Sequence, residues 1–455
     1  MFFIPRPTMI LVGFLGGIAL PSLAIVPSTA SRGEHQSPSS IVPTAAAAAE
    51  TSPVSLAVDR SIRPIRRAHA QSSGTATPVA AGVDRDFRQW LTEFRARAQR
   101  AGITTSTFDR AFAGVRPDAD IIRRDRNQSE FTRALWDYLD SAVSAARVRD
   151  GQTALATHRD ILAAIERRYG VEAEIVAAIW GLESAYGRVR GDTNVIAAMA
   201  TLAHDGRRRD FFEEQLIAAL RILQSGEVGP NGMRGSWAGA MGHTQFMPTS
   251  YLDYAVDITG DGRRDIWSDN PADALASTAN YLARFGWTSG QPWGMEVRLP
   301  QGFDYSQTGE RIKRNVAHWH RAGVRLPNGG RVPDHGRASI LLPAGANGVA
   351  FIIFDNFHVI ERYNTADAYV IAVGHLADRI TGDAAFQATW PRGDRALTFA
   401  EREELQNRLT RAGFPTEGID GIIGPNTIEA VRRYQASQGL VPDGYASLRI
   451  LQRLR

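Results

Sequence analysis

The segment Val171–Gly187 constrains the fold of this chain more than any other stretch. Its sequence, VEAEIVAAIWGLESAYG, is mostly apolar, and Val176, Trp180 and Glu183 follow one another at intervals of four and three residues. That spacing places the three side chains on one face of a helix. A carboxyl group in such a row faces either an ion-pair partner or a cavity. Burial beside an aromatic ring would raise its pKa and make it a general acid near neutral pH.

The composition limits the chemistry that the protein can use. The chain has 455 residues, 44% of them hydrophobic and 22% charged, which predicts two or three soluble folded units. It contains no cysteine, and this excludes disulfides, thiolate nucleophiles, cysteine-based zinc sites and iron–sulfur clusters. The net charge of +4 favours an anionic partner but does not indicate nucleic acid.

The first residues have the pattern of a secretory signal. Arg6 precedes the apolar run Met9–Leu20, and small residues follow this run. The order predicts a signal peptide over residues 1–27 and a periplasmic location. An uncleaved membrane anchor is the alternative, and Ala68–Ala70 offers a second small-x-small cleavage site. Other apolar runs fall short of the roughly 18 residues that span a bilayer, so we expect a protein that is peripheral to the membrane at most.

Changes in composition along the chain predict its domains. Residues 28–82 are rich in alanine, serine, threonine and proline, and they are predicted to form a disordered linker. The apolar runs 339–342 and 349–354 are typical of two strands joined by a loop, whereas most of the remaining patterns are helical. We therefore predict a mainly α (α+β) domain over residues 83–390 with a small strand insertion. A small helical module is predicted over residues 396–453.

Three ordered motifs carry a resemblance to a known family. They are ESAYG at 183–187, SWAGAMGHTQFMPTSY at 236–251 and NFHVIERYN at 356–364. The first is similar to the catalytic Glu-Ser motif of lytic transglycosylases. The second and third resemble the Gly-Ala-Met-Gly-x-x-Gln-Phe-Met-Pro-x-Ser-Tyr and Asn-Phe-x-Val-Ile-x-x-Tyr-Asn patterns of the membrane-bound lytic transglycosylase B family. The resemblance covers residues 83–390 and implies a lysozyme-like helical domain.

The resemblance also implies a set of site residues. Glu183 matches the single catalytic acid and base of that family. The residues that match its substrate-binding positions are Ser236, Gln245, Tyr363, Asn364 and Tyr369. Amide side chains suit N-acetyl and hydroxyl groups, and tyrosines offer a ring and a hydroxyl to a sugar. His243, Thr244 and His358 lie within the matching motifs and are interpreted as variation among sugar subsites.

The implied reaction is cleavage of the β-1,4 bond between N-acetylmuramic acid and N-acetylglucosamine in peptidoglycan. Peptidoglycan strands are therefore the expected binding partner. Glu183 would protonate the leaving oxygen and then deprotonate the muramoyl C6 hydroxyl, which closes a 1,6-anhydro ring. No cofactor is required. Two alternatives stay open at this point. A hydrolytic muramidase would need a second carboxylate, for which the motifs offer no candidate, and a non-catalytic wall-binding scaffold would not need Glu183. Any protein partners in cell-wall synthesis or division are unknown.

The segment Asp257–Ser268 resembles an EF-hand loop and is a candidate for a structural calcium site. Oxygen side chains stand at positions 1, 3, 5 and 9, and glycine stands at position 6. The predicted ligands are Asp257, Thr259 and Asp261. Ser268 replaces the usual carboxylate at position 12, so a metal-free turn that caps the helix near Pro271 is the alternative.

The C-terminal residues 396–453 resemble the peptidoglycan-binding domain 1 family, which is a small three-helix module. The resemblance is carried by IDGIIGPNTIEAVRRYQ at 419–435. Pro425 is predicted to open a helix, and Leu405, Leu409 and Phe414 are predicted to complete the core. This part of the chain is expected to hold the cell wall and not to catalyse.

Overall fold

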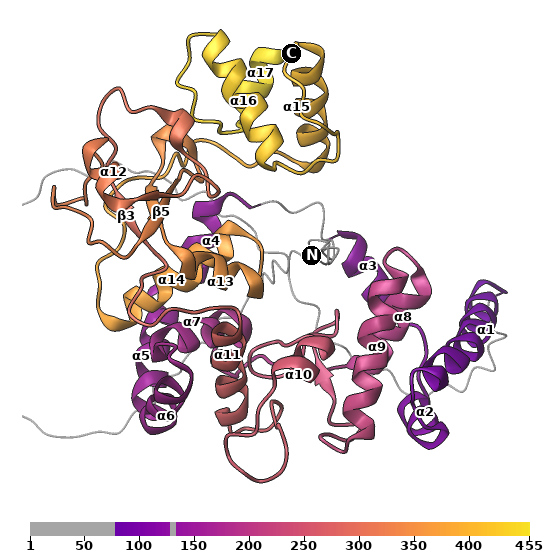
Figure 1. The fold of residues 1–455 in the computed structure, drawn as a ribbon. Helices are drawn as coiled ribbons and strands as arrows, with labels where there is room; N and C mark the ends of the chain where they lie inside the picture. The colour runs from indigo at the N-terminus through magenta and orange to yellow at the C-terminus, as the bar shows by residue number, and fades with distance from the viewer. Residues whose placement is uncertain (1–77, 128–132) are drawn as a thin grey trace, which may run out of the picture. The chain divides into compact units, whose positions relative to one another are not determined.

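The computed structural model describes residues 78–127 and 133–455 (Figure 1). The predicted signal peptide, 1–27, and most of the predicted linker, 28–82, lie outside the described residues. Helix α1 begins at Pro78, so residues 78–82 are helical and do not belong to a linker.

Helices build most of the large domain, as its periodicity predicted. Those before the sheet are α1 (Pro78–Arg100), α2 (Thr105–Phe112), α3 (Ala119–Asn127), α4 (Leu135–Ala142), α5 (Ala145–Thr157), α6 (Arg159–Tyr169), α7 (Ala173–Ser184), α8 (Val195–Asp205), α9 (Arg209–Gln224), α10 (Pro248–Tyr254) and α11 (Ala272–Arg284). Two more, α13 (Asp355–Tyr363) and α14 (Asp367–Thr381), follow the sheet. A pair of two-residue strands, β1 (Thr193–Asn194) and β2 (Arg234–Gly235), is too short to leave a periodic signal in the sequence.

Helix α7 lies at the centre of this domain. It packs against α5, α6, α11 and α14 (Figure 1). Val176 and Trp180 are buried, and so is most of the helix, because a segment that is apolar on all sides must be covered on all sides. The apolar row predicted from the sequence is therefore confirmed, and it holds Glu183 against the middle of the domain.

The strand insertion is a four-stranded antiparallel sheet in the order β3-β6-β5-β4. Its elements are β3 (Gly294–Val297), η1 (Tyr305–Gln307), β4 (Arg314–Asn315), α12 (Val316–Arg321), β5 (Arg337–Leu341), η2 (Gly345–Asn347) and β6 (Ala350–Ile353). The predicted strand pair is confirmed, with Ser339 opposite Ile353 and Leu341 opposite Phe351. Strands β3 and β4 were not predicted, because their sequences lack a run of apolar residues.

The sheet lies between two hydrophobic cores, and this explains the uninterrupted apolar runs in its sequence. Successive side chains of a strand point to opposite faces. Phe351 and Ile353 join the large core of the helical domain, whereas Ala350 and Ile352 join a smaller core with Trp319. Because both faces of β6 are covered, neither face can be polar.

The C-terminal module has a hydrophobic core of its own. Its helices are α15 (Phe399–Arg411), α16 (Pro425–Ser437) and α17 (Leu448–Leu454). Pro425 begins α16 as predicted, and Leu405, Leu409 and Phe414 contribute to the core. A capping box between Thr398 and Glu401 fixes the start of α15.

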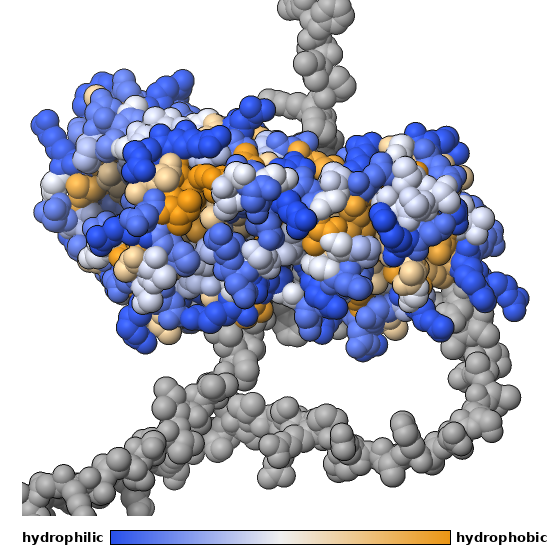
Figure 2. Space-filling model, turned by 90° about the horizontal axis from the view of Figure 1, so that it is seen from below, coloured by the Kyte–Doolittle hydropathy of each residue, from blue (hydrophilic) through white to orange (hydrophobic). Residues whose placement is uncertain are grey.

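Hydrophobic residues on the face drawn in Figure 2 form separate patches among hydrophilic ones. In the part of the chain that the structure describes, no helix has the length and apolar character needed to cross a bilayer.

Candidate active site

Glu183 lies in the last turn of α7, next to an abrupt change of chain direction. The helix ends at Ser184. Ala185, Tyr186 and Gly187 follow with φ angles of 51°, 58° and 81°, so three successive residues have left-handed backbone. Ser184 stabilises this turn: its Oγ accepts a hydrogen bond from the Gly187 N–H at 2.9 Å and donates one to the His243 carbonyl.

Only glycine fits at position 187. A Cβ atom there would lie 2.5 Å from the ring of His243, and the φ of 81° is unfavourable for any larger residue. The sequence ESAYG is thus explained by backbone geometry as well as by the carboxylate that begins it.

The carboxyl group of Glu183 has a single hydrogen-bond partner among the described residues. Its Oε1 accepts a hydrogen bond of 2.6 Å from the Tyr369 hydroxyl on α14. Burial raises the pKa of Glu183 to about 7, and the Tyr369 hydrogen bond lowers it in part. At neutral pH both protonation states are therefore populated, so one carboxyl group can donate a proton and later accept one.

Three tyrosines interact with Glu183. Tyr138 comes from α4, Tyr363 from the end of α13 and Tyr369 from α14. Burial, and then the charge of Glu183, raise the pKa of each tyrosine. All three hydroxyls therefore stay protonated and available as donors. Tyr138 was not predicted as a site residue, because it lies outside every recognised motif and only the folded chain brings it to Glu183.

The aromatic neighbour expected for Glu183 was a different one. Trp180 precedes Glu183 on the same helix face, but its indole N–H donates to His243 Nδ1 at 3.1 Å, and its ring meets those of His158 and Tyr186. The aromatic groups that act on the carboxyl group are the tyrosines. Burial raises the pKa of Glu183 as expected, and the tyrosine that contacts the carboxyl group lowers it in part.

Tyr363 and Gln245 join the glycine-rich motif to the site. The Tyr363 hydroxyl donates to the Thr244 carbonyl at 2.6 Å. Gln245 has a φ of 54°, and its Nε2 donates to the carbonyls of Arg190 at 3.0 Å and Gly242 at 2.8 Å. No described residue donates to the Gln245 side-chain oxygen, so this oxygen is the group that can accept a hydrogen bond from a sugar.

Ser236 and Asn364 hold the backbone near the site. Ser236 Oγ accepts from the Ala240 N–H at 3.0 Å and closes a tight turn in the glycine-rich motif. Asn364 is 9% exposed, and its Oδ1 accepts from the Ala366 N–H at 3.1 Å just before α14. No described hydrogen bond links either residue to Glu183, and their contact with sugar stays a prediction.

His243 and Thr244 are 3% and 1% exposed and cannot vary a sugar subsite, so that interpretation is wrong. His243 Nδ1 accepts the Trp180 proton, and its Nε2 lies 2.7 Å from the Ser268 carbonyl. This requires the tautomer with the proton on Nε2. Burial lowers the pKa of His243, which keeps the ring neutral. The hydrogen bonds of His243 thus connect α7 with the candidate calcium loop.

The candidate calcium loop brings three carboxylates together. Oxygen atoms of Asp257, Asp261 and Asp273 lie within 4.8 Å of one another. Asp257 and Asp261 were predicted, but Asp273 was missed because it lies on α11, beyond the twelve-residue template. The Thr259 hydroxyl donates to Asp257 Oδ1 at 3.0 Å, and its role as a ligand stays a prediction. The donor set is oxygen alone, which suits Ca²⁺.

Comparisons with known proteins agree with this geometry. Residues 86–378 match the transglycosylase SLT domain family, and residues 400–454 match the putative peptidoglycan-binding domain family. Membrane-bound lytic murein transglycosylase B of Escherichia coli (strain K12) is 34% identical over 252 residues. These residues are 53% of this chain and 66%, just under two thirds, of that protein.

Solved structures share the fold. SltB3 of Pseudomonas aeruginosa, in complex with NAG-anhNAM-pentapeptide, is 50% identical with a TM-score of 0.79, over 81% of this chain and 99% of that one. Slt35, a lytic transglycosylase of Escherichia coli in complex with calcium, is 29% identical with a TM-score of 0.55, over 65% of this chain and 92% of that one. The predicted fold class is confirmed. The chain belongs to the transglycosylase SLT domain family and carries a peptidoglycan-binding domain over residues 400–454.

Proposed function

We propose that this protein is a lytic transglycosylase that cleaves peptidoglycan between N-acetylmuramic acid and N-acetylglucosamine, with Glu183 as its only acid and base. One observation carries the proposal: the half-buried Glu183 carboxyl at the end of α7 accepts a hydrogen bond of 2.6 Å from Tyr369, and burial raises its pKa to about 7. No second carboxylate among the described residues contributes to this pKa. A two-carboxylate hydrolase of the retaining type would place its pair about 5 Å apart.

The first step uses the protonated form of Glu183. Its proton passes to the oxygen that links the two sugars, the bond from that oxygen to the muramoyl anomeric carbon breaks, and the N-acetylglucosamine end leaves as an alcohol. Positive charge develops on the anomeric carbon. The Tyr369 hydroxyl, which stays protonated, donates to the carboxylate that Glu183 has become.

The second step uses the ionised form. Glu183 removes the proton from the muramoyl C6 hydroxyl, whose oxygen bonds to the anomeric carbon and closes the 1,6-anhydro ring. The carboxyl group regains its proton, and no water is consumed. Attack within one sugar ring removes the entropic cost of bringing in a second molecule, which is worth several kcal/mol at least.

The relatives support this chemistry. SltB3, half identical to this chain, was solved in complex with NAG-anhNAM-pentapeptide, which carries the anhydro sugar that the second step would form. The Gln245 oxygen, Ser236, Tyr363 and Asn364 are proposed to contact the glycan. The peptidoglycan-binding domain would keep the enzyme on the wall.

The released products test the proposal. The full chain is incubated with peptidoglycan, and the muropeptides are analysed by mass spectrometry. We expect anhydro ends, lighter than reducing ends by one water. Glu183→Gln should lower their release at least about 100-fold, because general acid–base catalysis is lost. Glu174→Gln is the matched control, since Glu174 lies on the same helix and burial also raises its pKa.

Two results would contradict the proposal. Reducing ends that disappear with Glu183→Gln would indicate a muramidase. Equal release of anhydro ends by the wild type and by Glu183→Gln would remove Glu183 from the mechanism.

Calcium binding is proposed for the loop that contains Asp257 and Asp261, together with Asp273. Three carboxylates in one group repel one another, and a divalent cation would offset that charge and join the loop to α11. Slt35 was solved with calcium. The ion would act on stability alone, since no described catalytic side chain belongs to the group.

Thermal unfolding tests this site. Calcium should raise the melting temperature of the wild type by several degrees after treatment with a chelator. Asp261→Asn should abolish the rise. Asp304→Asn is the control, because Asp304 also accepts hydrogen bonds in an exposed turn but lies outside the group. A melting temperature that is independent of calcium would leave the loop as a metal-free turn.

Export to the periplasm is the corresponding proposal for location. It is supported by the order of Arg6, the apolar run Met9–Leu20 and the small residues after it. Fractionation of cells that produce the full chain tests it: recovery in the cytoplasm would contradict it.

A further inference from the structure

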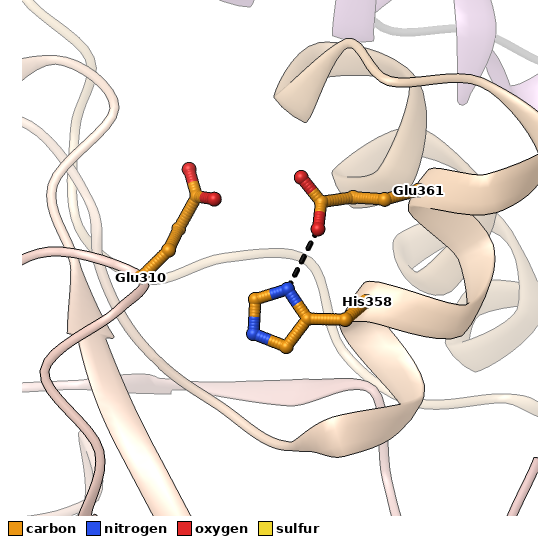
Figure 3. A group of neighbouring side chains, drawn as sticks. All are labelled: Glu310, His358 and Glu361. Carbon is orange, nitrogen blue, oxygen red and sulfur yellow. Dashed lines mark hydrogen bonds and ion pairs between the residues drawn. The ribbon is translucent and has the colours of Figure 1, made fainter. Parts of the chain in front are cut away.

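A group of titratable side chains lies apart from Glu183 and from the calcium loop. Glu310 comes from the segment between η1 and β4, whereas His358 and Glu361 come from α13. One ligand atom of each residue lies within 4.8 Å of those of the other two. Figure 3 shows the carboxyl groups of Glu310 and Glu361 pointing toward each other beside the His358 ring. We call these three residues the Glu310 cluster.

Two segments distant in sequence are needed to form the cluster. His358 and Glu361 stand three residues apart on one face of α13, and His358 Nδ1 lies 2.6 Å from Glu361 Oε2. Both residues occupy positions that the Asn-Phe-x-Val-Ile-x-x-Tyr-Asn pattern leaves open. The cluster is therefore not accounted for by the residues that define the family motif.

A third carboxyl group, that of Asp367, lies beside the cluster. Asp367, in the first turn of α14, forms a side-chain hydrogen bond with Glu310, so one of these two carboxyl groups must hold a proton. The basic groups that interact electrostatically with Glu310 are His358, within the cluster, and the neighbouring Arg311. Within residues 78–127 and 133–455, no lysine or arginine forms a salt bridge with Glu310, Glu361 or Asp367.

The donor set indicates which cation would fit. Imidazole nitrogen and carboxylate oxygen are both ligands of zinc and related divalent ions, whereas calcium prefers oxygen alone. The other histidine pair of this region does not converge: His318 lies 2.7 Å from Gln307 Oε1, and His320 lies 3.0 Å from the Val332 carbonyl. Among the described histidines of the insertion and α13, only His358 meets two carboxylates.

We propose that Glu310, His358 and Glu361 bind a divalent transition-metal ion of the zinc type. Ligand bonds of about 2.1 Å would place neighbouring ligand atoms about 3.3 Å apart. The distance between His358 Nδ1 and Glu361 Oε2 would increase slightly, and the Glu310 carboxylate would move closer to both. The hydrogen bond from Asp367 would orient Glu310. The ion would fasten the segment before β4 to α13, whose last residue is Tyr363.

Calorimetry with zinc alone as the probe tests this site. The full chain is freed of metal, supplied with excess calcium to fill the other loop, and titrated with Zn²⁺. We expect one zinc ion per chain and release of protons on binding. Glu361→Gln, Glu310→Gln and His358→Gln should each weaken binding at least about tenfold, because each removes one ligand. His318→Gln, a histidine outside the cluster, should bind zinc as the wild type does.

Diffraction gives an independent readout that needs no variant. Anomalous scattering at the zinc edge from crystals of the full chain grown with zinc should place one ion between the three side chains. Absence of zinc binding, or binding that survives all three substitutions, would overturn the proposal. An anomalous peak at another place, with none between these three side chains, would also overturn the proposal. Far-ultraviolet circular dichroism on each variant ensures that weaker binding is not caused by unfolding.

Discussion

At the scale of the residue, the chemistry depends on how one carboxyl group is surrounded. No charged partner among the described residues holds Glu183 ionised, and burial brings its pKa to about 7. Tyr369 limits the rise by donating to the carboxylate at 2.6 Å. The tyrosine therefore balances the two roles: a higher pKa would keep more of the group protonated but make it a weaker proton donor, and a lower one would do the reverse.

Tyr369→Phe tests this balance. The substitution removes a hydrogen bond that lowers the pKa of Glu183, so the pKa should rise by about one unit, or about 1.4 kcal/mol. Glu183 must be protonated for the first step, and activity therefore falls as pH rises through its pKa. The alkaline limb of kcat/KM should move to higher pH, while the maximum falls because a carboxyl group of higher pKa is a weaker proton donor in the first step. The measurement is the rate of anhydro-end formation against pH.

Tyr434→Phe is the control for that substitution, because Tyr434 packs in the core of the C-terminal module. Its pH profile should match the wild type. An unchanged alkaline limb in Tyr369→Phe would mean that Tyr369 does not set the pKa of Glu183.

At the scale of the element, the end of α7 decides where Glu183 points. The left-handed residues after Ser184 turn the chain at once, and His243 fills the space that a side chain at position 187 would need. His243 in turn contacts Trp180 on α7 and the Ser268 carbonyl. Contacts of His243 therefore connect the turn after Ser184, helix α7 and the candidate calcium loop.

Gly187→Ala measures that support. The new methyl group would meet the His243 ring at 2.5 Å in backbone with φ of 81°. We expect the free energy of unfolding to fall by about 2–3 kcal/mol, from backbone strain plus overpacking, together with a loss of activity. Gly286→Ala is the matched control: its φ is 93°, but nothing lies within 4 Å of the added atom. Denaturant unfolding of both variants separates the backbone strain from the steric clash with His243. Equal losses of unfolding free energy in the two variants would show that His243 does not exclude a side chain at position 187.

At the scale of the whole molecule, the proposed catalytic domain and the peptidoglycan-binding module have separate hydrophobic cores. The large domain contains the main core and the sheet with its own smaller core, and the C-terminal module has a third. Arg432 of the module donates to Thr308 Oγ1 of the insertion at 3.1 Å, but no core residue is shared. Removal of the module therefore leaves the other two cores complete.

Deletion of residues 396–455 tests this separation. We expect kcat/KM on a short soluble glycan to stay within about twofold of the full chain, because Glu183 and its tyrosines lie outside the deleted part. Solubilisation of intact peptidoglycan should fall by tenfold or more, since the binding module raises the effective concentration of substrate. Turbidity loss of a wall suspension measures the second rate. An equal loss on both substrates would indicate that the module supports the active site itself.

Much of this protein could be predicted from short patterns. The helix around Val176 and Trp180, the strand pair with Ser339 opposite Ile353 and the three-helix module are periodic or motif-based features, and all three are confirmed. Strands of two residues and the helical start at Pro78 carry no such period, so they were missed or assigned to other structure.

The sequence by itself determined the family, the fold class and the carboxylate in the last turn of α7, because local spacing and linear motifs carry that information. Only the tertiary structure decided what surrounds the carboxylate. It brought Tyr138 and Tyr369 to Glu183, buried His243, placed Asp273 beside the candidate calcium loop and placed Glu310 near His358. These groups come from segments far apart along the chain. Their proximity follows from how the helices pack, and no local periodicity encodes it.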